Sequence, residues 1–169
     1  MVILGVDPAL SVTGYGAIDA GRNNIFLLEA GVITTPPQEA LPQRLDKIFR
    51  GVTKLISDTK PAVLVLEKLY AHYRHPTTAY LLGHARGVIC LACSRQNVAM
   101  VEYAATRVKK AVVGRGQASK EQVQRMVLNF LKVDVVPKYT DVTDALALAL
   151  AHSNIIKAAK IAAKDLRRA

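Results

Sequence analysis

Two unbroken apolar runs in this sequence each end in an acidic residue. Residues 2–6 precede Asp7, and residues 62–66 precede Glu67. Apolar runs of this length predict strands that are buried on both faces of a sheet. Because ligands of open α/β sheets bind outside the carboxyl ends of the strands, both carboxylates stand where a functional site is expected. Taken alone, Asp7 could also be an ordinary turn or capping residue.

The other elements follow in an order that predicts a single α/β domain. The links between the first three strands are short and polar, which favours an antiparallel meander. Helical apolar patterns then alternate with two further strands. The first three expected strands are at 2–7, through 17–19 and at 26–35, and a helix at 38–59 follows them. The remaining expected elements are a strand at 62–67, a helix at 76–94, a strand at 97–103, and helices from 119 to about 131 and from 140 to beyond 158.

This order resembles the ribonuclease-H-like fold, an α/β fold whose five-stranded mixed sheet has the order 3-2-1-4-5 and is flanked by helices. The first strand lies beside the fourth in that sheet. Asp7 and Glu67 would therefore stand side by side at one sheet edge. We expect the nuclease-like domain to occupy residues 1–156 and residues 157–169 to form a frayed, basic C-terminal tail.

The composition favours a polyanionic partner. The chain has 169 residues and a net charge of +10, and this balance favours nucleic acid, although basic charge can also serve solubility alone. No segment reaches the roughly 18 consecutive apolar residues that a membrane span needs. The first residues lack the basic and apolar pattern of a secretion signal. We therefore expect no membrane partner and a cytoplasmic, nucleoid-associated location.

A second pair of carboxylates, Asp141 and Asp144, opens the last predicted helix. Three residues apart, they project from one helix face with their β-carbons about 5–6 Å apart. As acids in a first turn, they could simply complement the helix dipole. Together with Asp7 and Glu67 they make four carboxylates, and two bare charges 4 Å apart repel by about 4 kcal/mol at an effective dielectric constant of 20. Such a cluster persists if it is protonated, spread apart or bound to a metal.

The carboxylates would offer a metal only oxygen ligands, which indicates Mg²⁺ or Mn²⁺ rather than zinc. In a basic protein this favours phosphodiester hydrolysis, in which two ions about 3.5–4 Å apart activate the attacking water and stabilise the leaving oxygen. The sequence has neither a GxxxxGK[ST] phosphate-binding loop nor a nucleophile elbow. The segment 68–75 mixes aromatic residues with cations such as Arg74, a composition typical of nucleic-acid contact surfaces.

Five motifs together resemble the RuvC family of Holliday junction resolvases. The match extends from about residue 2 to residue 152, nearly the whole expected domain. Many nucleases and transposases of this fold share the carboxylate framework, whereas the full set in this order is specific to RuvC. The motifs are Gly5-Val6-Asp7-Pro8 with Thr13-Gly14-Tyr15-Gly16, the strand ending in Glu67, Gly83-His84-Ala85-Arg86-Gly87, Val112-Val113-Gly114-Arg115-Gly116, and Asp141-Val142-Thr143-Asp144-Ala145-Leu146-Ala147.

The resemblance implies a homodimeric, Mg²⁺-dependent endodeoxyribonuclease. Such an enzyme cuts two opposed strands of a four-way DNA junction symmetrically during recombination and repair. One or two Mg²⁺ ions per subunit, with Mn²⁺ as a substitute, would bind the carboxylates. The helix that carries Gly83 and Gly87 would lie at the dimer interface, and branch-migration motor proteins would be partners.

The resemblance also assigns roles to individual residues. Lys120 is placed to stabilise the negative charge that develops during cleavage. Tyr70 matches an aromatic residue that stacks on a base at the opened crossover, and Lys109 matches a lysine at the site. The family's catalytic carboxylates match Asp7, Glu67, Asp141 and Asp144. The expected DNA contacts are Tyr70, Arg74, Lys109, Lys110, Arg115 and Lys120.

The sequence departs from the family pattern at Ala9, where glycine is usual, and at His84, where glutamine is usual. The segment 71–75 is richer in His and Tyr than is typical, which could change the sequence preference of cleavage. Two other classes stay open: a non-catalytic junction-binding protein whose acids are structural, and another nuclease or integrase of the same fold. His152 is interpreted as a buried histidine with a satisfied hydrogen bond rather than a contact to metal ligands or DNA.

Overall fold

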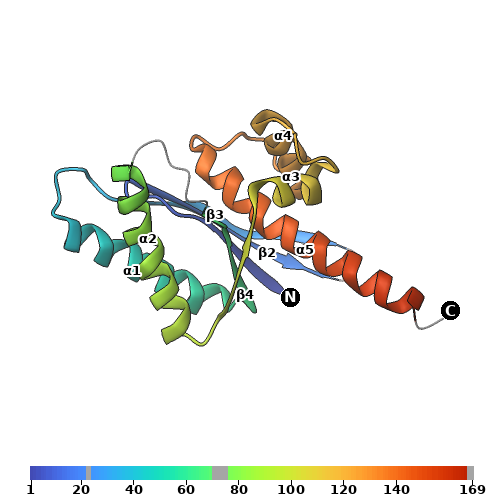
Figure 1. Ribbon diagram of the computed structural model, residues 1–169, viewed down its shortest axis with the longest axis horizontal. Helices are drawn as coiled ribbons and strands as arrows, with labels where there is room; N and C mark the ends of the chain where they lie inside the picture. Colours follow the sequence, from blue (N-terminus) through green and yellow to red (C-terminus); the bar gives the residue numbers. More distant parts are fainter. Residues whose placement is uncertain (22–23, 70–75, 167–169) are drawn as a thin grey trace.

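A five-stranded mixed sheet forms the centre of the molecule in the computed structural model, which describes residues 1–21, 24–69 and 76–166 (Figure 1). Its strands are β1 (Val2–Asp7), β2 (Val12–Ala20), β3 (Ile25–Thr34), β4 (Val63–Glu67) and β5 (Ala99–Tyr103). The order across the sheet is β3-β2-β1-β4-β5. The first three strands form an antiparallel meander, and β4 runs parallel to both β1 and β5. The predicted ribonuclease-H-like topology is therefore confirmed.

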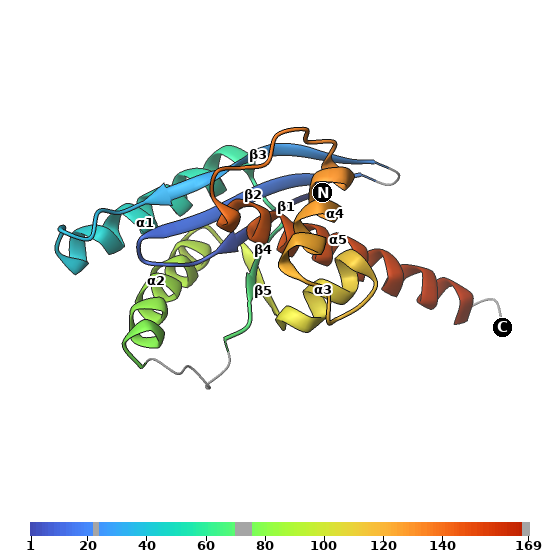
Figure 2. The same ribbon diagram turned by 90° about the horizontal axis from the view of Figure 1, so that it is seen from above.

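Helices cover both faces of the sheet (Figures 1 and 2). Because side chains alternate along a strand, β1 contributes to two separate cores. Ile3 packs with one group of helices, and Leu4 and Val6 pack with the other. The face that receives Leu4 and Val6 is covered by α1 (Leu41–Thr59) and α2 (Pro76–Arg95), and the opposite face by α3 (Ala105–Val113), α4 (Lys120–Leu131) and α5 (Thr140–Leu166).

Two glycines let α5 approach the sheet closely. A Cβ atom added to Gly5 would lie 1.9 Å from the carbonyl oxygen of Ala145, and one added to Gly14 would lie 2.1 Å from that of Asp141. No other residue leaves this space for the helix backbone. The close approach fixes the first turns of α5 over the end of β1, where Asp7 lies.

The sequence pattern does not predict α3. This segment is rich in cations, and its buried apolar residues are Val108 and Val112, one helical turn apart. Gly114 ends the helix in the left-handed region, with φ at 89°. A short amphipathic helix of nine residues therefore stands where the sequence suggests only a basic loop.

The end of α5 also differs from the expectation. The sequence predicts a frayed tail from Lys157, whereas α5 continues as one helix to Leu166. Alanine and lysine, which dominate this stretch, both favour helix. Residues 158–165 are exposed and project beyond the sheet (Figure 1). A domain boundary at 156 remains a prediction, and the helix crosses that position without a break.

α5 is long and apolar enough to cross a membrane by length and composition alone. However, 50% of its most apolar window is buried inside the protein. The buried part includes the whole run from Ala145 to Ala151. Its apolar character is explained by its place in the core.

Candidate active site

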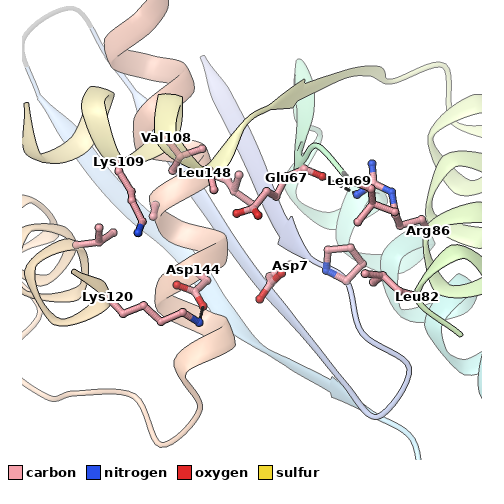
Figure 3. Close-up of a pocket in the computed structure, with 14 residues that line it drawn as sticks. Asp7, Glu67, Leu69, Leu82, Arg86, Val108, Lys109, Lys120, Asp144 and Leu148 are labelled. Atoms are coloured by element: carbon pink, nitrogen blue, oxygen red, sulfur yellow. Dashed lines mark hydrogen bonds and ion pairs between the residues drawn. The ribbon is translucent and has the colours of Figure 1, made fainter. Parts of the chain in front are cut away.

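The ends of β1 and β4 bring Asp7 and Glu67 to one edge of the sheet (Figure 3). The two strands are parallel and in register, with Val6 opposite Leu66, so the acids that follow are neighbours, as the sequence predicts. Asp144 reaches the same place from the beginning of α5. The three acids line one pocket of about 290 Å³.

Asp141 lies beside this pocket rather than among the residues that line it. It stands one turn before Asp144, where its backbone passes over Gly14. Its negative charge still acts on the site, because it contributes to raising the pKa of Asp7. The structure therefore brings the four predicted carboxylates to one region, three of them in the pocket wall.

Burial and the negative charge of neighbouring acids raise the pKa values of two site carboxyls, Asp7 and Glu67. The pKa of Asp7 is raised from 3.8 to about 7, first by burial and then by the charges of Asp144, Asp141 and Glu67, while Lys120 opposes the shift. The pKa of Glu67 is raised by burial and by Asp144, and nearby cations oppose that rise. A carboxyl group that titrates near pH 7 in a cleft is a marker of a functional site.

Two lysines complete the pocket wall. The Nζ atom of Lys120 lies 3.6 Å from Oδ2 of Asp144. Lys120 is the first residue of α4, and a capping box fixes that helix start. In it the backbone N–H of Gln122 donates to Oγ of Ser119 at 3.3 Å, and the Ser119 N–H donates to Oε1 of Gln122 at 3.0 Å. Lys109 reaches the pocket from α3.

Two other predicted DNA contacts, Lys110 and Arg115, lie outside this pocket. Lys110 belongs to α3, and Arg115 belongs to the loop after it. Tyr70 and Arg74 lie outside the described residues. Their assignment to DNA contact remains a prediction from the sequence.

The donor set of the pocket fits a hard divalent cation. Among the described residues, no three His, Cys, Asp or Glu side chains stand in an arrangement that could hold a metal ion as they are placed. The acids of the pocket nevertheless offer only oxygen, the ligand that Mg²⁺ prefers. Part of the rise in the pKa of Asp7 comes from repulsion by its neighbours, and a bound cation would relieve that repulsion.

Arg86 is a residue of the site to which the sequence assigns no role. It lies on α2, is only 8% exposed and lines the pocket beside Glu67 (Figure 3). The available signal was its position on the otherwise apolar stripe formed by Ala85, Ile89 and Cys93, which are all buried. A charged residue on the buried face of a helix requires a partner.

His152 is buried and satisfied, as predicted. Its Nδ1 atom lies 2.8 Å from the hydroxyl of Tyr103. Burial lowers the pKa of the imidazole, which favours its neutral form. His152 does not line the pocket, so it belongs to the core between β5 and α5.

Fold and pocket together define a class, a nuclease of the ribonuclease-H-like fold. The family model of the crossover junction endodeoxyribonuclease RuvC matches residues 3–152. The chain belongs to the RuvC family, whose members are metal-dependent nucleases.

Curated members of the RuvC family are similar to this chain over most of their length. A crossover junction endodeoxyribonuclease RuvC from Alkaliphilus oremlandii is 42% identical over 154 residues, which cover 91% of this chain and 93% of the relative. The corresponding protein from Rhodopirellula baltica is 43% identical over 148 residues, with 88% and 83% covered.

Solved structures give the same result. The structure of Thermus thermophilus RuvC matches with a TM-score of 0.86 and 31% identity, covering 94% of this chain and 97% of the other. The T. thermophilus protein in complex with a Holliday junction substrate matches with a TM-score of 0.84 and 29% identity, with 93% and 95% covered. The yeast mitochondrial resolvase Ydc2, at 12% identity and a TM-score of 0.67, covers 90% of this chain and 77% of its own and shares the fold.

Proposed function

We propose that this chain is a structure-selective endodeoxyribonuclease that resolves four-way DNA junctions by symmetric, paired phosphodiester hydrolysis in recombination and repair. The observation that carries the proposal is the pocket, where three acids and two lysines face one space at the end of β1 and β4. The acids supply metal ligands and the lysines supply phosphate contacts. Relatives that carry the RuvC name align with this chain from end to end of the fold.

Mg²⁺, one or two ions per subunit, is the cofactor that this proposal assigns, with Mn²⁺ as a substitute. Asp7, Glu67 and Asp144 would hold it from the pocket wall, with Asp141 beside them. When bound, the metal supplies a Lewis acid for the attacking water and the leaving oxygen. With a pKa of about 7, the Asp7 carboxyl holds a proton in about half of the molecules at that pH in the absence of a cation. It must release this proton before it can serve as a ligand.

The lysines act on the phosphate. Lys120 is held near Asp144 by attraction across 3.6 Å, and its side chain is 77% exposed. It can therefore turn from the carboxylate toward a phosphate at the mouth of the pocket, where it would stabilise the charge that develops in the transition state. Lys109 approaches from α3 and would bind the DNA backbone beside the cleaved bond.

A homodimer would place two such pockets on one junction. On α2, a Cβ atom added to Gly83 or Gly87 would have no neighbour within 4 Å among the described residues. Tyr80 and Leu91 continue the same stripe, and they are 63% and 48% exposed. An apolar, small-residue stripe that no part of the described chain covers fits a second copy of the same helix, as the family resemblance implies.

Partners beyond the junction follow from the family alone. We propose branch-migration motor proteins as partners and a cytoplasmic, nucleoid-associated location. The net charge of +10 supports association with DNA.

The test is cleavage of end-labelled four-way junctions and of matched linear duplex, with Mg²⁺ or with chelator. We expect paired symmetric nicks in the junction only. Asp7→Asn should abolish the nicks while junction binding is retained or strengthened, because the substitution removes a metal ligand and also a charge that repels DNA. Tight binding without nicks by the unchanged protein would support a non-catalytic junction-binding role instead, and equal cutting of duplex would remove the junction as the specific substrate.

A further inference from the structure

The buried guanidinium of Arg86 bridges two strands at the edge of the pocket. Its Nη1 atom donates to the backbone carbonyl oxygen of Glu67 at 2.7 Å. Its Nη2 atom donates to Oε1 of Glu102 and forms an ion pair with that carboxylate. α2 is thereby tied to the last residue of β4 and to β5.

Glu67 has no pairing partner in β1, so its backbone is held by the sheet on one side only. The ladder between β1 and β4 ends at the pair Val6–Leu66, one residue before Glu67. On the other side Glu67 is still paired with Tyr103, and the next N–H, of Lys68, donates to the carbonyl of Tyr103 at 2.8 Å. The carbonyl of Glu67 itself is held by Arg86.

Stability alone does not explain this arrangement. Replacing a buried ion pair by apolar residues of similar volume is often neutral or stabilising, and α2 is otherwise apolar on this face. Burying a guanidinium is costly unless it is paired and hydrogen-bonded, and Arg86 meets this condition only through its contacts with Glu67 and Glu102. Here the fixed fork of arginine spans a carbonyl and a carboxylate that lysine could not reach together.

We infer that Arg86 is a positioning residue for the cleavage reaction: it fixes the backbone of Glu67, so that the carboxylate of Glu67 is held at the pocket for the metal. The inference rests on the metal site proposed above. Groups that orient metal ligands from behind typically change metal affinity or activity by about 10–100-fold when they are removed. Both hydrogen bonds of the Arg86 guanidinium go to Glu67 and Glu102, so Arg86 acts through Glu67.

The test compares Arg86→Gln, which removes the charge and the fork, with Arg86→Lys, which keeps the charge but cannot make both contacts. Arg95→Gln, on the same helix and exposed, is the matched control. Mn²⁺ binding to the DNA-free protein is measured by electron paramagnetic resonance. Cleavage is measured in single turnover with saturating protein over a range of Mg²⁺ concentrations, and junction affinity is measured with Ca²⁺.

We expect both Arg86 variants to bind Mn²⁺ about 10-fold more weakly and to cleave bound junctions at least about 10-fold more slowly. Their affinity for the junction should stay within about twofold of the unchanged protein, since the substitution leaves the phosphate-binding lysines in place. Arg95→Gln should match the unchanged protein in every measurement. A structural role alone would lower the melting temperature without moving Mn²⁺ affinity.

Two results would overturn the inference. One is an Arg86→Gln variant whose Mn²⁺ affinity and cleavage rate equal those of the unchanged protein. The other is full rescue by Arg86→Lys, which would mean that charge rather than geometry matters. If Arg86→Gln does not fold, as judged by circular dichroism, Arg86→Lys decides by the same criteria.

The proposed metal site can fail separately. If the unchanged protein and Asp7→Asn bind Mn²⁺ equally, Asp7 is not a ligand and the metal site proposed above is wrong. The cleavage rates of the Arg86 variants against Arg95→Gln still decide whether Arg86 positions Glu67 for the reaction.

Discussion

Asp7→Asn should stabilise the fold at the same time as it removes activity. The pKa of Asp7 is raised from 3.8 to about 7 in the folded chain, so the folded state binds more protons than the unfolded state between these values. Stability therefore falls as the pH rises from about 4 to about 7. Asparagine has a similar shape and no charge, so this loss disappears in the variant.

The size of the effect follows from the pKa difference. A difference of about 3 in pKa corresponds to about 4 kcal/mol, which is the largest gain that Asp7→Asn could give above pH 7. Side-chain rotation and water in the open pocket relieve part of the desolvation and part of the repulsion, so we expect about half, near 2 kcal/mol. For a chain of this length that raises the melting temperature by about 4–8 °C.

The assay is thermal unfolding followed by circular dichroism at pH 5 and pH 8 in the presence of chelator. The advantage of Asp7→Asn should be large at pH 8 and small at pH 5. Asp134→Asn, an exposed acid outside the pocket, controls for the removal of one negative charge. Mg²⁺ added at pH 8 should raise the melting temperature of the unchanged protein more than that of the variant, because a ligand stabilises the state that binds it. Equal melting temperatures for the two proteins at both pH values would refute the reasoning.

Two further substitutions test the fold and the proposed dimer. Gly5→Ala should cost about 3 kcal/mol or more and lower the melting temperature by about 6–12 °C, because its Cβ would meet backbone atoms of α5. Gly51→Ala, whose Cβ would meet only the side chain of Ile33, should cost far less, and equal losses in calorimetry would contradict the close-packing argument. Gly87→Arg should convert the proposed dimer into monomers in sedimentation equilibrium, because it places a charge in the stripe on α2. Ala158→Arg, exposed on α5, should leave the oligomeric state unchanged, and a Gly87→Arg dimer would exclude this interface.

The topology was predictable because its signals are local. Apolar runs of five residues predict buried strands, and short polar links favour antiparallel pairing of the strands that they join. Once the order of the sheet is fixed, the neighbourhood of Asp7 and Glu67 follows from geometry, since both end parallel strands. Asp144 joins them because α5 is apolar enough to require burial on the same sheet.

What the sequence did not reveal depends on contacts between distant segments. α3 has too few apolar residues for a helical period, and it forms because Val108 and Val112 find the core beside α5. The role of Arg86 depends on a carbonyl and a carboxylate that lie 19 and 16 residues away. No sequence spacing predicts contacts between Arg86, Glu67 and Glu102, so they can be identified only in the folded structure.

α5 is a single 27-residue helix that is anchored at one end only, so its backbone amides should exchange with solvent at very different rates. The amides near Ala145 to Ala151 lie in the core and would exchange only when the whole domain opens, whereas those beyond Lys157 can open by fraying. Exchange should therefore become faster along α5 with distance from the acids of the pocket. A label or fusion attached at residue 166 would sit about 33 Å along the helix axis from Asp144, far enough to report on the protein without disturbing its chemistry.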